Sequence, residues 1–547
     1  MRIYKAPLFQ VLTIIILSIS LKLFLLFIDV IPFNADEAIV GLMAKHILQG
    51  EHSIFFYGQS YMGSLDAYLI AGVIKLIGEG VYAIRVVQIF LYALFIMSTY
   101  FIGKSIYGSN TIGFIAGLLL ALPVVNITLY TTVSLGGYGE ALVISNGLFI
   151  LGYYLINELD QINKIPEKWT YQRLRLFSSS FCFLVGLGIW VNGITLVFSI
   201  PITLLLIIFI LRNKSRIPLK VINQITTIGL LAGLIGLSPW MYYAITIGID
   251  QLFYELLGSA VNVEMGSWLS VLFDHLVNYF LLGGTVLFGF RPPWEVRWLG
   301  LPLIPFVIFV WIYMIVIWLR KIVIRGNENQ LQNYMIIGIF IFQFIGFVFT
   351  PFGVDPSGRY FLPLSMPLAI LVGEIIDHLS ENKRLKLFIV GLLILFNMTG
   401  NIQCALNNPP GITTQFDQVT AIDHSYDETL VDFLRLNNAF YGFSNYWVSY
   451  PLAYKSNEEI LYIPLLPYHQ DLRYTSRDNR IDKYNEIVFG SENLSYITTN
   501  NEKLDIQIET SLMNNEISWK EKIIGDYHIY YDLSRVILPE NIFDYDT

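Results

Sequence analysis

The sequence predicts a mainly α-helical protein that crosses a membrane about eleven times and carries a small α/β domain at its C-terminal end. Of its 547 residues, 55% are hydrophobic and only 14% are charged, whereas soluble proteins usually carry about a quarter charged residues. Apolar runs of about 20 residues recur as far as Cys404, and each can cross a hydrocarbon core about 30 Å thick. Beyond Cys404 such runs end and the composition becomes acidic.

The first apolar run, about Leu8 to Ile28, follows Arg2 and Lys5. This pattern resembles a signal peptide, but the run is long and lacks a cleavage site of small residues. It predicts a retained signal-anchor helix.

The predicted spans are separated by short polar loops. They are roughly Leu8–Ile31, Tyr82–Gly103, Ile112–Thr131, Tyr138–Leu155, Leu176–Trp190, Gly193–Leu211, Thr226–Ile247, Leu301–Leu319, Tyr334–Thr350, Phe361–His378 and Leu385–Met398. A further apolar segment, Leu276–Phe290, is assigned to an outer loop. The two segments within 176–211 are short, which is typical of tilted or partly re-entrant helices.

Basic residues separate the two sides of the membrane. Alternate loops hold about 17 Lys and Arg, whereas the opposite loops hold about six, and the positive-inside rule places the richer set in the cytoplasm. The loops 32–81, 132–137, 248–298 and 351–360 then lie outside. An odd number of spans also puts the C-terminus outside. The pattern as a whole predicts a multi-pass protein of the cell membrane.

The chain divides into a membrane domain, 1–404, and an extracytoplasmic domain, 405–547. The segment 411–547 has 22 Asp and Glu against 10 Lys and Arg, so it is too acidic to bind an anionic membrane face strongly. Helix-like and strand-like stretches alternate in it at Leu430–Leu436, Ile460–Ile463 and Glu486–Phe489, with a hairpin expected across Ile517–Tyr531. No basic stripe suggests nucleic acid, and two cysteines provide neither a disulfide framework nor a metal cluster.

The first outer loop, 32–81, begins with the acidic pair Asp36-Glu37 directly beyond a span. Asn34 or Asp36 can cap a following helix and Gly50 can end it, and the helix dipole alone would explain acidic residues there. The position at the membrane boundary favours a chemical role instead. So does the aromatic stretch from Phe55 to Ser64 in the same loop.

Other charged residues emerge near the same side. Glu140 enters the outer end of a span, where a carboxylate is costly and usually functional. Lys22 lies within the first span and either snorkels outward or holds an anion inside the bundle. Arg291, Arg297 and Arg359 are outer cations, which either anchor the membrane interface or bind phosphate through their bidentate fork.

These residues resemble a known group. Asp36-Glu37-Ala38 after the first span, Arg85-Val86-Val87 opening the second, and Arg359-Tyr360-Phe361-Leu362-Pro363 followed by Pro367 resemble motifs of the protein O-mannosyltransferase and aminoarabinose-transferase group of GT-C glycosyltransferases. The resemblance covers about residues 8–400. No Trp-Trp-Asp-type segment is present, and Asn445-Tyr446-Trp447-Val448 is not one, which argues against N-glycosylation.

The resemblance implies a GT-C-like membrane fold and transfer of a sugar, with inversion, from a polyprenyl phosphate to a glycan, lipid or protein acceptor outside the membrane. Asp36 matches the loop aspartate that acts as general base or positions the acceptor, with Glu37 as its helper and Glu140 as a second carboxylate. The expected donor-phosphate and acceptor residues form two sets. The first is Lys22, Arg85, Arg291 and Arg359, and the second is His46, Tyr57, Gln59, Tyr61, Tyr138 and Glu264.

Two other functions remain open at this stage. A transporter or flippase for a lipid-linked saccharide should show internal repeats with matched broken helices, and the sequence shows none. A non-catalytic membrane scaffold that presents the C-terminal domain is the other alternative. No cofactor is required, although two or three carboxylates could hold a divalent metal ion.

Overall fold

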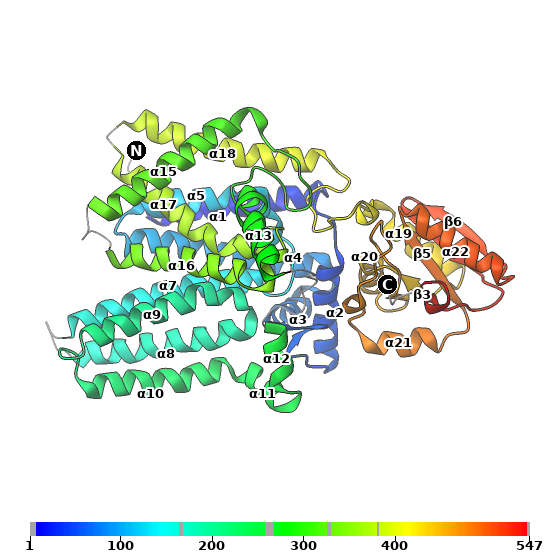
Figure 1. Ribbon diagram of the computed structural model, residues 1–547, viewed down its shortest axis with the longest axis horizontal. Helices are drawn as coiled ribbons and strands as arrows, with labels where there is room; N and C mark the ends of the chain where they lie inside the picture. Colours follow the sequence, from blue (N-terminus) through cyan, green and yellow to red (C-terminus); the bar gives the residue numbers. More distant parts are fainter. Residues whose placement is uncertain (1–6, 163–167, 257–266, 325–329, 380–381, 544–547) are drawn as a thin grey trace.

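The computed structural model describes residues 7–162, 168–256, 267–324, 330–379 and 382–543. In these ranges eleven helices are long and apolar enough to cross a membrane. Long helices lie side by side in a bundle, and the C-terminal segment projects from one end of it (Figure 1). The predicted fold class, a mainly helical multi-pass membrane protein with a small mixed sheet near its C-terminus, is confirmed.

The bundle contains helices from the whole first three quarters of the chain. They are α1 (Pro7–Phe27), α4 (Val81–Phe101, continued to Ile106), α5 (Asn110–Ala121), α7 (Tyr138–Gln161), α8 (Lys168–Val191), α9 (Leu196–Arg212), α10 (Leu219–Gly236), α15 (Ile304–Ile324), α16 (Gln330–Val348), α17 (Ser365–His378) and α18 (Lys383–Leu406). α8 and α9 are full-length helices, so the expectation of short, partly re-entrant segments in this region is wrong.

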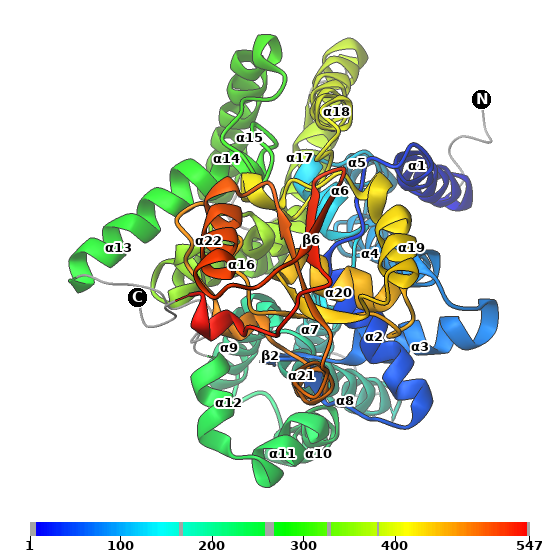
Figure 2. The same cartoon turned by 90° about the vertical axis from the view of Figure 1, so that its right-hand side faces the viewer.

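Two segments differ from simple spans. The predicted span Ile112–Thr131 is interrupted after Ala121, because Pro123 lacks the N–H that would continue the helix, and a short helix, α6 (Val125–Tyr130), follows. The apolar segment Trp268–Leu287 is long enough to span, but its first part, α13 (Trp268–Val277), lies across the bundle (Figures 1 and 2). With α5 along the bundle and α13 across it, eleven helices of the described residues run along the bundle.

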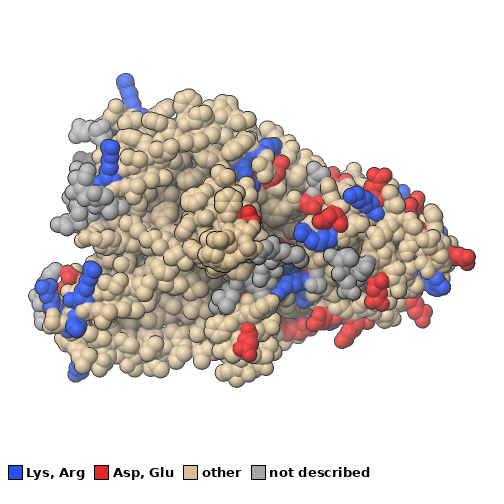
Figure 3. All heavy atoms as spheres, viewed as in Figure 1, with Lys and Arg blue, Asp and Glu red and all other residues tan. Residues whose placement is uncertain are grey.

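The two ends of the bundle differ in charge. Figure 3 shows Lys and Arg gathered at the end opposite the C-terminal segment, where the loops predicted to be cytoplasmic lie. The end that carries the C-terminal segment shows both signs, with many Asp and Glu. The separation of basic residues derived from the sequence therefore corresponds to the two ends of one bundle.

The C-terminal segment is built on a five-stranded mixed sheet with the strand order β4-β3-β5-β7-β6. Its strands are β3 (Tyr441–Ser444), β4 (Leu461–Pro464), β5 (Leu494–Thr499), β6 (Lys520–Ile524) and β7 (Tyr527–Tyr531), and its helices are α19 (Asp427–Leu436), α20 (Tyr446–Lys455), α21 (Asp482–Phe489) and α22 (Glu502–Asn514). β3 pairs in parallel with β4 and β5, whereas β6 and β7 form the predicted hairpin.

The first loop, 32–81, connects the bundle to this sheet. It contains α2 (Ala35–Gln49), β1 (Phe55–Phe56), β2 (Gln59–Gly63) and α3 (Leu65–Ile77), and its apolar residues share one buried cluster with those of the C-terminal segment. α2 and α20 approach closely at Gly41, where a Cβ atom would lie 2.5 Å from the ring of Tyr454. A larger residue at position 41 would therefore push the two helices apart.

Candidate functional site

The site begins at the first turn of α2. The side chain of Asn34 accepts a hydrogen bond of 2.9 Å from the backbone N–H of Glu37, and Gly50 ends the helix in the left-handed conformation. Both caps agree with the prediction from the sequence. Because neighbouring helical residues point in different directions, this turn sends Asp36 and Glu37 to different surroundings.

Asp36 faces the C-terminal segment and remains partly exposed. Its Oδ1 accepts a hydrogen bond from the phenol of Tyr446 and lies 3.8 Å from Nη1 of Arg480. The guanidinium of Arg480 lies 4.8 Å from the ring centroid of Tyr446 and 5.3 Å from that of Phe56. A carboxylate, a phenol and a cation thus meet where the first loop contacts the C-terminal segment.

A second cation faces the same region from the membrane domain. Burial raises the pKa of Tyr61, the charges of Arg359 and Arg480 lower it, and those of Asp36 and Glu255 raise it. Tyr138 also interacts with Arg359 and Tyr61. Residues from three distant parts of the chain therefore surround Tyr61, and they include the predicted residues Asp36, Arg359 and Tyr138.

A further acid completes this group. Burial raises the pKa of Asp478 to about 7, where Arg480 lowers it and the negative charge of Asp36 raises it. The hydroxyl of Tyr450 donates a hydrogen bond of 2.8 Å to the backbone carbonyl of Asp478 and accepts one of 2.7 Å from the backbone N–H of Arg480. Tyr450 thereby fixes the turn that presents both charged residues. We call Asp36, Tyr61, Tyr446, Asp478 and Arg480 the Asp36 cluster.

Glu37 takes a different role. Its carboxylate is fully buried and pairs with Arg85 through two contacts, Nε to Oε1 at 3.0 Å and Nη2 to Oε2 at 3.1 Å. Nη2 also donates to the backbone carbonyls of Ile31 and Pro32. The pair ties α2 to α4 and to the end of the first span, an arrangement that favours a structural role for both residues over base catalysis or phosphate binding.

Glu140 lies with another buried acid. Asp66, in the first turn of α3, accepts hydrogen bonds from the hydroxyl of Ser134 and from the amide of Gln88 at 2.9 Å. Burial raises the pKa of Asp66 to about 6. Glu140 is 3% exposed, neither of its carboxylate oxygens has a side-chain hydrogen-bond partner among the described residues, and the charge of Asp66 acts on it. The structure therefore groups Glu140 with Asp66, an acid that the sequence-based prediction omitted.

Lys22 points into the bundle and does not snorkel outward. Its Nζ donates to the carbonyl of Thr131 at 2.6 Å and to the hydroxyls of Thr131 and Thr132 at 2.8 Å each, and it lies 4.3 Å from the ring centroid of Tyr92. The three protons of the ammonium group are thus used within the protein. The arrangement favours a role in holding α1 against the segment after α6.

Arg291 and Arg359 also differ from each other in their contacts. Arg291 donates to the backbone carbonyls of Leu282, Pro292 and Pro356 at 3.0 to 3.2 Å, so its side chain fastens the loop around it. Arg359 pairs with Asp355 through its Nε at 2.5 Å, and its positive charge also acts on Tyr61 and Tyr138. Of the predicted phosphate-binding residues, Arg359 lies beside the Asp36 cluster.

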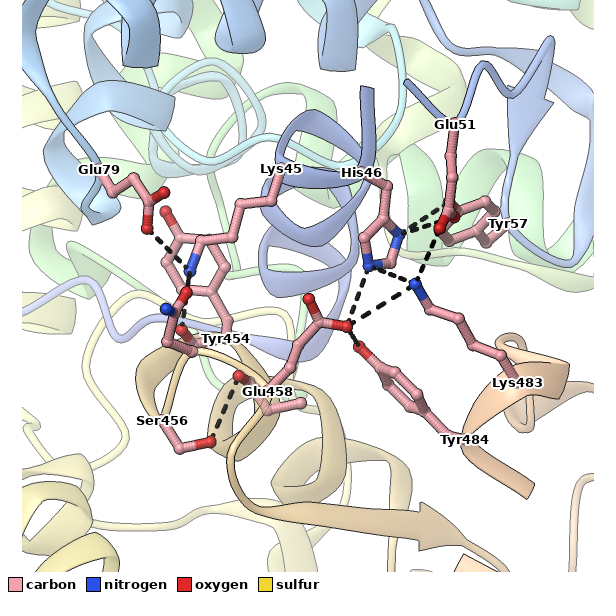
Figure 4. A network of polar contacts seen from close by, with 12 residues as sticks. Lys45, His46, Glu51, Tyr57, Glu79, Tyr454, Ser456, Glu458, Lys483 and Tyr484 are labelled. Atoms are coloured by element: carbon pink, nitrogen blue, oxygen red, sulfur yellow. Dashed lines mark hydrogen bonds and ion pairs between the residues drawn. The ribbon is translucent and has the colours of Figure 1, made fainter. Parts of the chain in front are cut away.

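His46 and Tyr57 lie in a polar network between α2 and the C-terminal segment (Figure 4). His46 Nδ1 lies 2.9 Å from the hydroxyl of Tyr57, and His46 Nε2 lies 3.0 Å from Glu458 and 2.9 Å from Lys483. Burial raises the pKa of Glu458, but hydrogen bonds from His46 and Tyr484 and the charge of Lys483 outweigh it and lower the value to about 2. This network holds the two parts together.

The remaining predictions are placed as follows. Gln59 accepts a hydrogen bond of 3.4 Å from the hydroxyl of Tyr61, and Glu264 lies outside the described residues. A group that could hold a metal ion, Glu509, Glu521 and His528, lies on α22 and the β6–β7 hairpin. These elements are separate from the first loop.

The residues that the sequence-based prediction missed come from the C-terminal segment. Tyr446, Asp478 and Arg480 follow Asp36 by more than 400 positions, and no motif connects them to it. One weak signal existed, because Arg477 and Arg480 are cations in a strongly acidic segment. The structure adds Gly58, which has a φ of +72° and where a Cβ atom would lie 2.9 Å from the side chain of Arg480.

No protein-family model and no curated protein matches the chain. Several solved structures, however, are similar to it. ArnT from Cupriavidus metallidurans bound to undecaprenyl phosphate has a TM-score of 0.56 at 10% identity, with 95% of this chain and 98% of that chain covered. The apo state of ArnT gives a TM-score of 0.57 at 10% identity, with coverages of 97% and 98%.

The oligosaccharyltransferase AglB from Archaeoglobus fulgidus, in complex with an inhibitory peptide and a dolichol-phosphate, gives a TM-score of 0.52 at 11% identity. The match covers 90% of this chain and 69% of that chain. Both the bundle and the C-terminal segment thus have counterparts in these enzymes. The chain therefore has the fold of the GT-C membrane glycosyltransferases.

Proposed function

We propose that this protein is a membrane glycosyltransferase that moves a sugar from a polyprenyl phosphate to a glycan, lipid or protein acceptor at the outer membrane face. The observation that carries the proposal is the Asp36 cluster. A partly exposed carboxylate accepts a hydrogen bond from Tyr446 and lies 3.8 Å from the buried guanidinium of Arg480, where the first loop contacts the C-terminal segment. The fold supports the same class, since similar structures contain undecaprenyl phosphate and dolichol-phosphate.

Asp36 is the proposed general base. The acceptor oxygen or nitrogen forms a bond to the anomeric carbon while the bond from that carbon to the phosphate oxygen breaks. The acceptor proton passes to Asp36, and the bonding electron pair leaves with the phosphate. A general base must lie about 2.6–3.2 Å from the acceptor atom, which the partly exposed carboxylate of Asp36 permits and the buried carboxylate of Glu37 does not.

The developing charge on the leaving phosphate needs a cation that is already in place. Arg359 fits this role because Asp355 holds its guanidinium on one side while its positive charge also acts on Tyr61.

The test uses cells that lack the protein and express either the wild type or Asp36→Asn. We expect the wild type to restore a glycan mass in lipid-linked sugars or cell-surface glycans, measured by mass spectrometry. Asp36→Asn should reduce the transfer rate roughly 100- to 10,000-fold, the usual contribution of a general base, while the protein remains folded in the membrane.

Asp29→Asn is the matched control. Asp29 is an exposed carboxylate at the outer end of α1 with a φ of +50°, a conformation that Asn adopts readily. Normal transfer by Asp36→Asn would overturn the role of Asp36. If the wild type changes no glycan but alters the sidedness of a lipid-linked sugar, the protein is a flippase and the enzymatic proposal fails.

A further inference from the structure

Arg480 is a buried cation with unused hydrogen-bond donors. Its side chain is 8% exposed, and its Nε and Nη1 have no hydrogen-bond partner among the described residues. The 3.8 Å between Nη1 and Oδ1 of Asp36 is too long for a direct hydrogen bond. Leaving buried donors unpaired is costly, so this arrangement indicates a ligand that supplies the missing acceptor atoms.

The protein holds this guanidinium in place before any ligand arrives. The rings of Phe56 and Tyr446 lie 5.3 and 4.8 Å from it. The aliphatic part of the Arg480 side chain lies against Gly58, where any side chain would collide with it. A fork fixed in this way loses little freedom on binding, and its geometry matches the two oxygens of a phosphate or carboxylate.

The distance from the guanidinium of Arg480 to the carboxylate of Asp36 indicates which of the two substrates Arg480 contacts. The base lies about 2.6–3.2 Å from the attacking atom, and the attacking atom starts about 3–3.5 Å from the anomeric carbon. The phosphate leaves from the opposite face of that carbon, so its oxygen is more than about 6 Å from the base. A guanidinium nitrogen 3.8 Å from Asp36 is within easy hydrogen-bond reach of groups around the attacking atom, whereas the leaving oxygen lies at the limit of its reach, so this position favours the side of the acceptor.

We propose that Arg480 binds an anionic group, a phosphate or a carboxylate, that the acceptor carries next to its nucleophilic hydroxyl or amine. This inference rests on the proposed function. Arg480 would then select the acceptor, while Arg359 faces the leaving phosphate. Asp36 and Asp478 are the acids whose charges act on Arg480, and they offset its positive charge.

The first experiment measures binding without transfer. Inorganic phosphate is titrated into the purified full-length protein, and thermal unfolding is followed. We expect stabilisation of the wild type and of Asp36→Asn, and a loss of roughly 10- to 100-fold in phosphate affinity in Arg480→Gln, the usual range for charge-assisted hydrogen bonds. Arg473→Gln, an exposed arginine of the same segment, should bind as the wild type does.

The second experiment measures transfer and shows whether Arg480 binds the acceptor or the phosphate of the donor. With the acceptor found by mass spectrometry, Arg480→Gln should raise the KM for the acceptor roughly 10- to 100-fold and leave the KM for the donor unchanged. Arg480→Lys, which keeps the charge but not the fork, should fall between the two. Removing the anionic group from the acceptor should erase the difference between wild type and Arg480→Gln.

Three outcomes would overturn the inference. They are equal phosphate binding by wild type and Arg480→Gln, a raised KM for the donor alone, and an acceptor that carries no anionic group. The proposed function is judged separately. Phosphate binding that depends on Arg480 in a protein without transferase activity would refute the enzymatic proposal while retaining an anion site.

Discussion

Asp36 and Glu37 are neighbours in the chain, but they face two different regions of the molecule. Glu37 points toward the membrane bundle, is fully buried and forms a two-contact pair with Arg85. Asp36 points toward the C-terminal segment and its side chain remains partly exposed to solvent. It contacts Tyr446 and Arg480 without a close ion pair. The helix turns through about 100° between them, and this rotation separates a carboxylate that holds two helices together from one that stays open to a ligand.

The comparison shows how one acidic pair can serve two purposes. A carboxylate with a close, buried cation stabilises packing and is poorly placed to accept a proton from a substrate. A carboxylate with a cation at 3.8 Å and part of its surface open can do so. The following predictions test this difference, beginning with the largest expected effect on stability.

Glu37→Gln should destabilise the protein far more than Asp36→Asn. Removing one partner of a buried ion pair leaves an uncompensated charge, here Arg85, and costs about 3–5 kcal/mol. Thermal unfolding in detergent measures the effect, and Asp36→Asn is the matched control because it makes the same kind of change one residue away. If Glu37→Gln unfolds normally but stops transfer, then Glu37 is a catalytic helper and the division between the two faces is wrong.

Asp478 allows the second comparison, because its stability effect depends on pH. Its pKa in the folded protein is about 7 and about 3.9 in an unfolded chain, so the folded state binds the proton more tightly. The stability of the wild type should therefore fall as pH rises from about 4 to about 7.

Asp478→Asn removes this dependence. At pH 8 the variant should be more stable than the wild type by up to about 4 kcal/mol, since each tenfold difference in proton affinity between the folded and unfolded states corresponds to about 1.4 kcal/mol, and the advantage should vanish near pH 4. Thermal unfolding across that range measures it, with the exposed Asp482→Asn as control. A constant difference at all pH values would show that Asp478 is not buried beside Asp36.

Glu458→Gln should have the smallest effect, a loss of about 1–3 kcal/mol confined to the contact between α2 and the C-terminal segment. The pKa of Glu458 is lowered to about 2, so its stabilisation is fully present above about pH 4.5 and is lost as pH falls through about 2. Limited proteolysis at pH 7 should cleave the C-terminal segment faster in this variant. Glu492→Gln, which changes an exposed acid, should behave as the wild type; equal protection of both variants would contradict the role of the network.

Much of the fold follows from local patterns. The caps Asn34 and Gly50 were predictable because capping depends on residues within one turn. The hairpin β6–β7 and the ends of the bundle were predictable for similar reasons, since alternation and the distribution of basic loops are visible in the sequence. The break at Pro123 was also a local signal, but the length of the apolar run obscured it.

The site was only partly predictable. Asp36, Tyr61, Tyr138 and Arg359 lie near span ends on one side, so the separation of basic loops and the resemblance to GT-C enzymes placed them in the same region. Their pairing was not predictable, because a sequence does not show that Arg85 is occupied by Glu37 or that threonines hold Lys22. The sequence also could not connect Arg480 to Asp36, because that contact depends on how the C-terminal segment packs against the first loop.

The contact between the first loop and the last quarter of the chain has a consequence for biogenesis. Ribosomes make Asp36 early and Arg480 late, and every span between them must be inserted before the two residues can meet. A nascent or truncated chain then contains Asp36 without its neighbouring cation. The Asp36 cluster, and with it the proposed activity, is therefore complete only after the C-terminal segment has folded against the first loop.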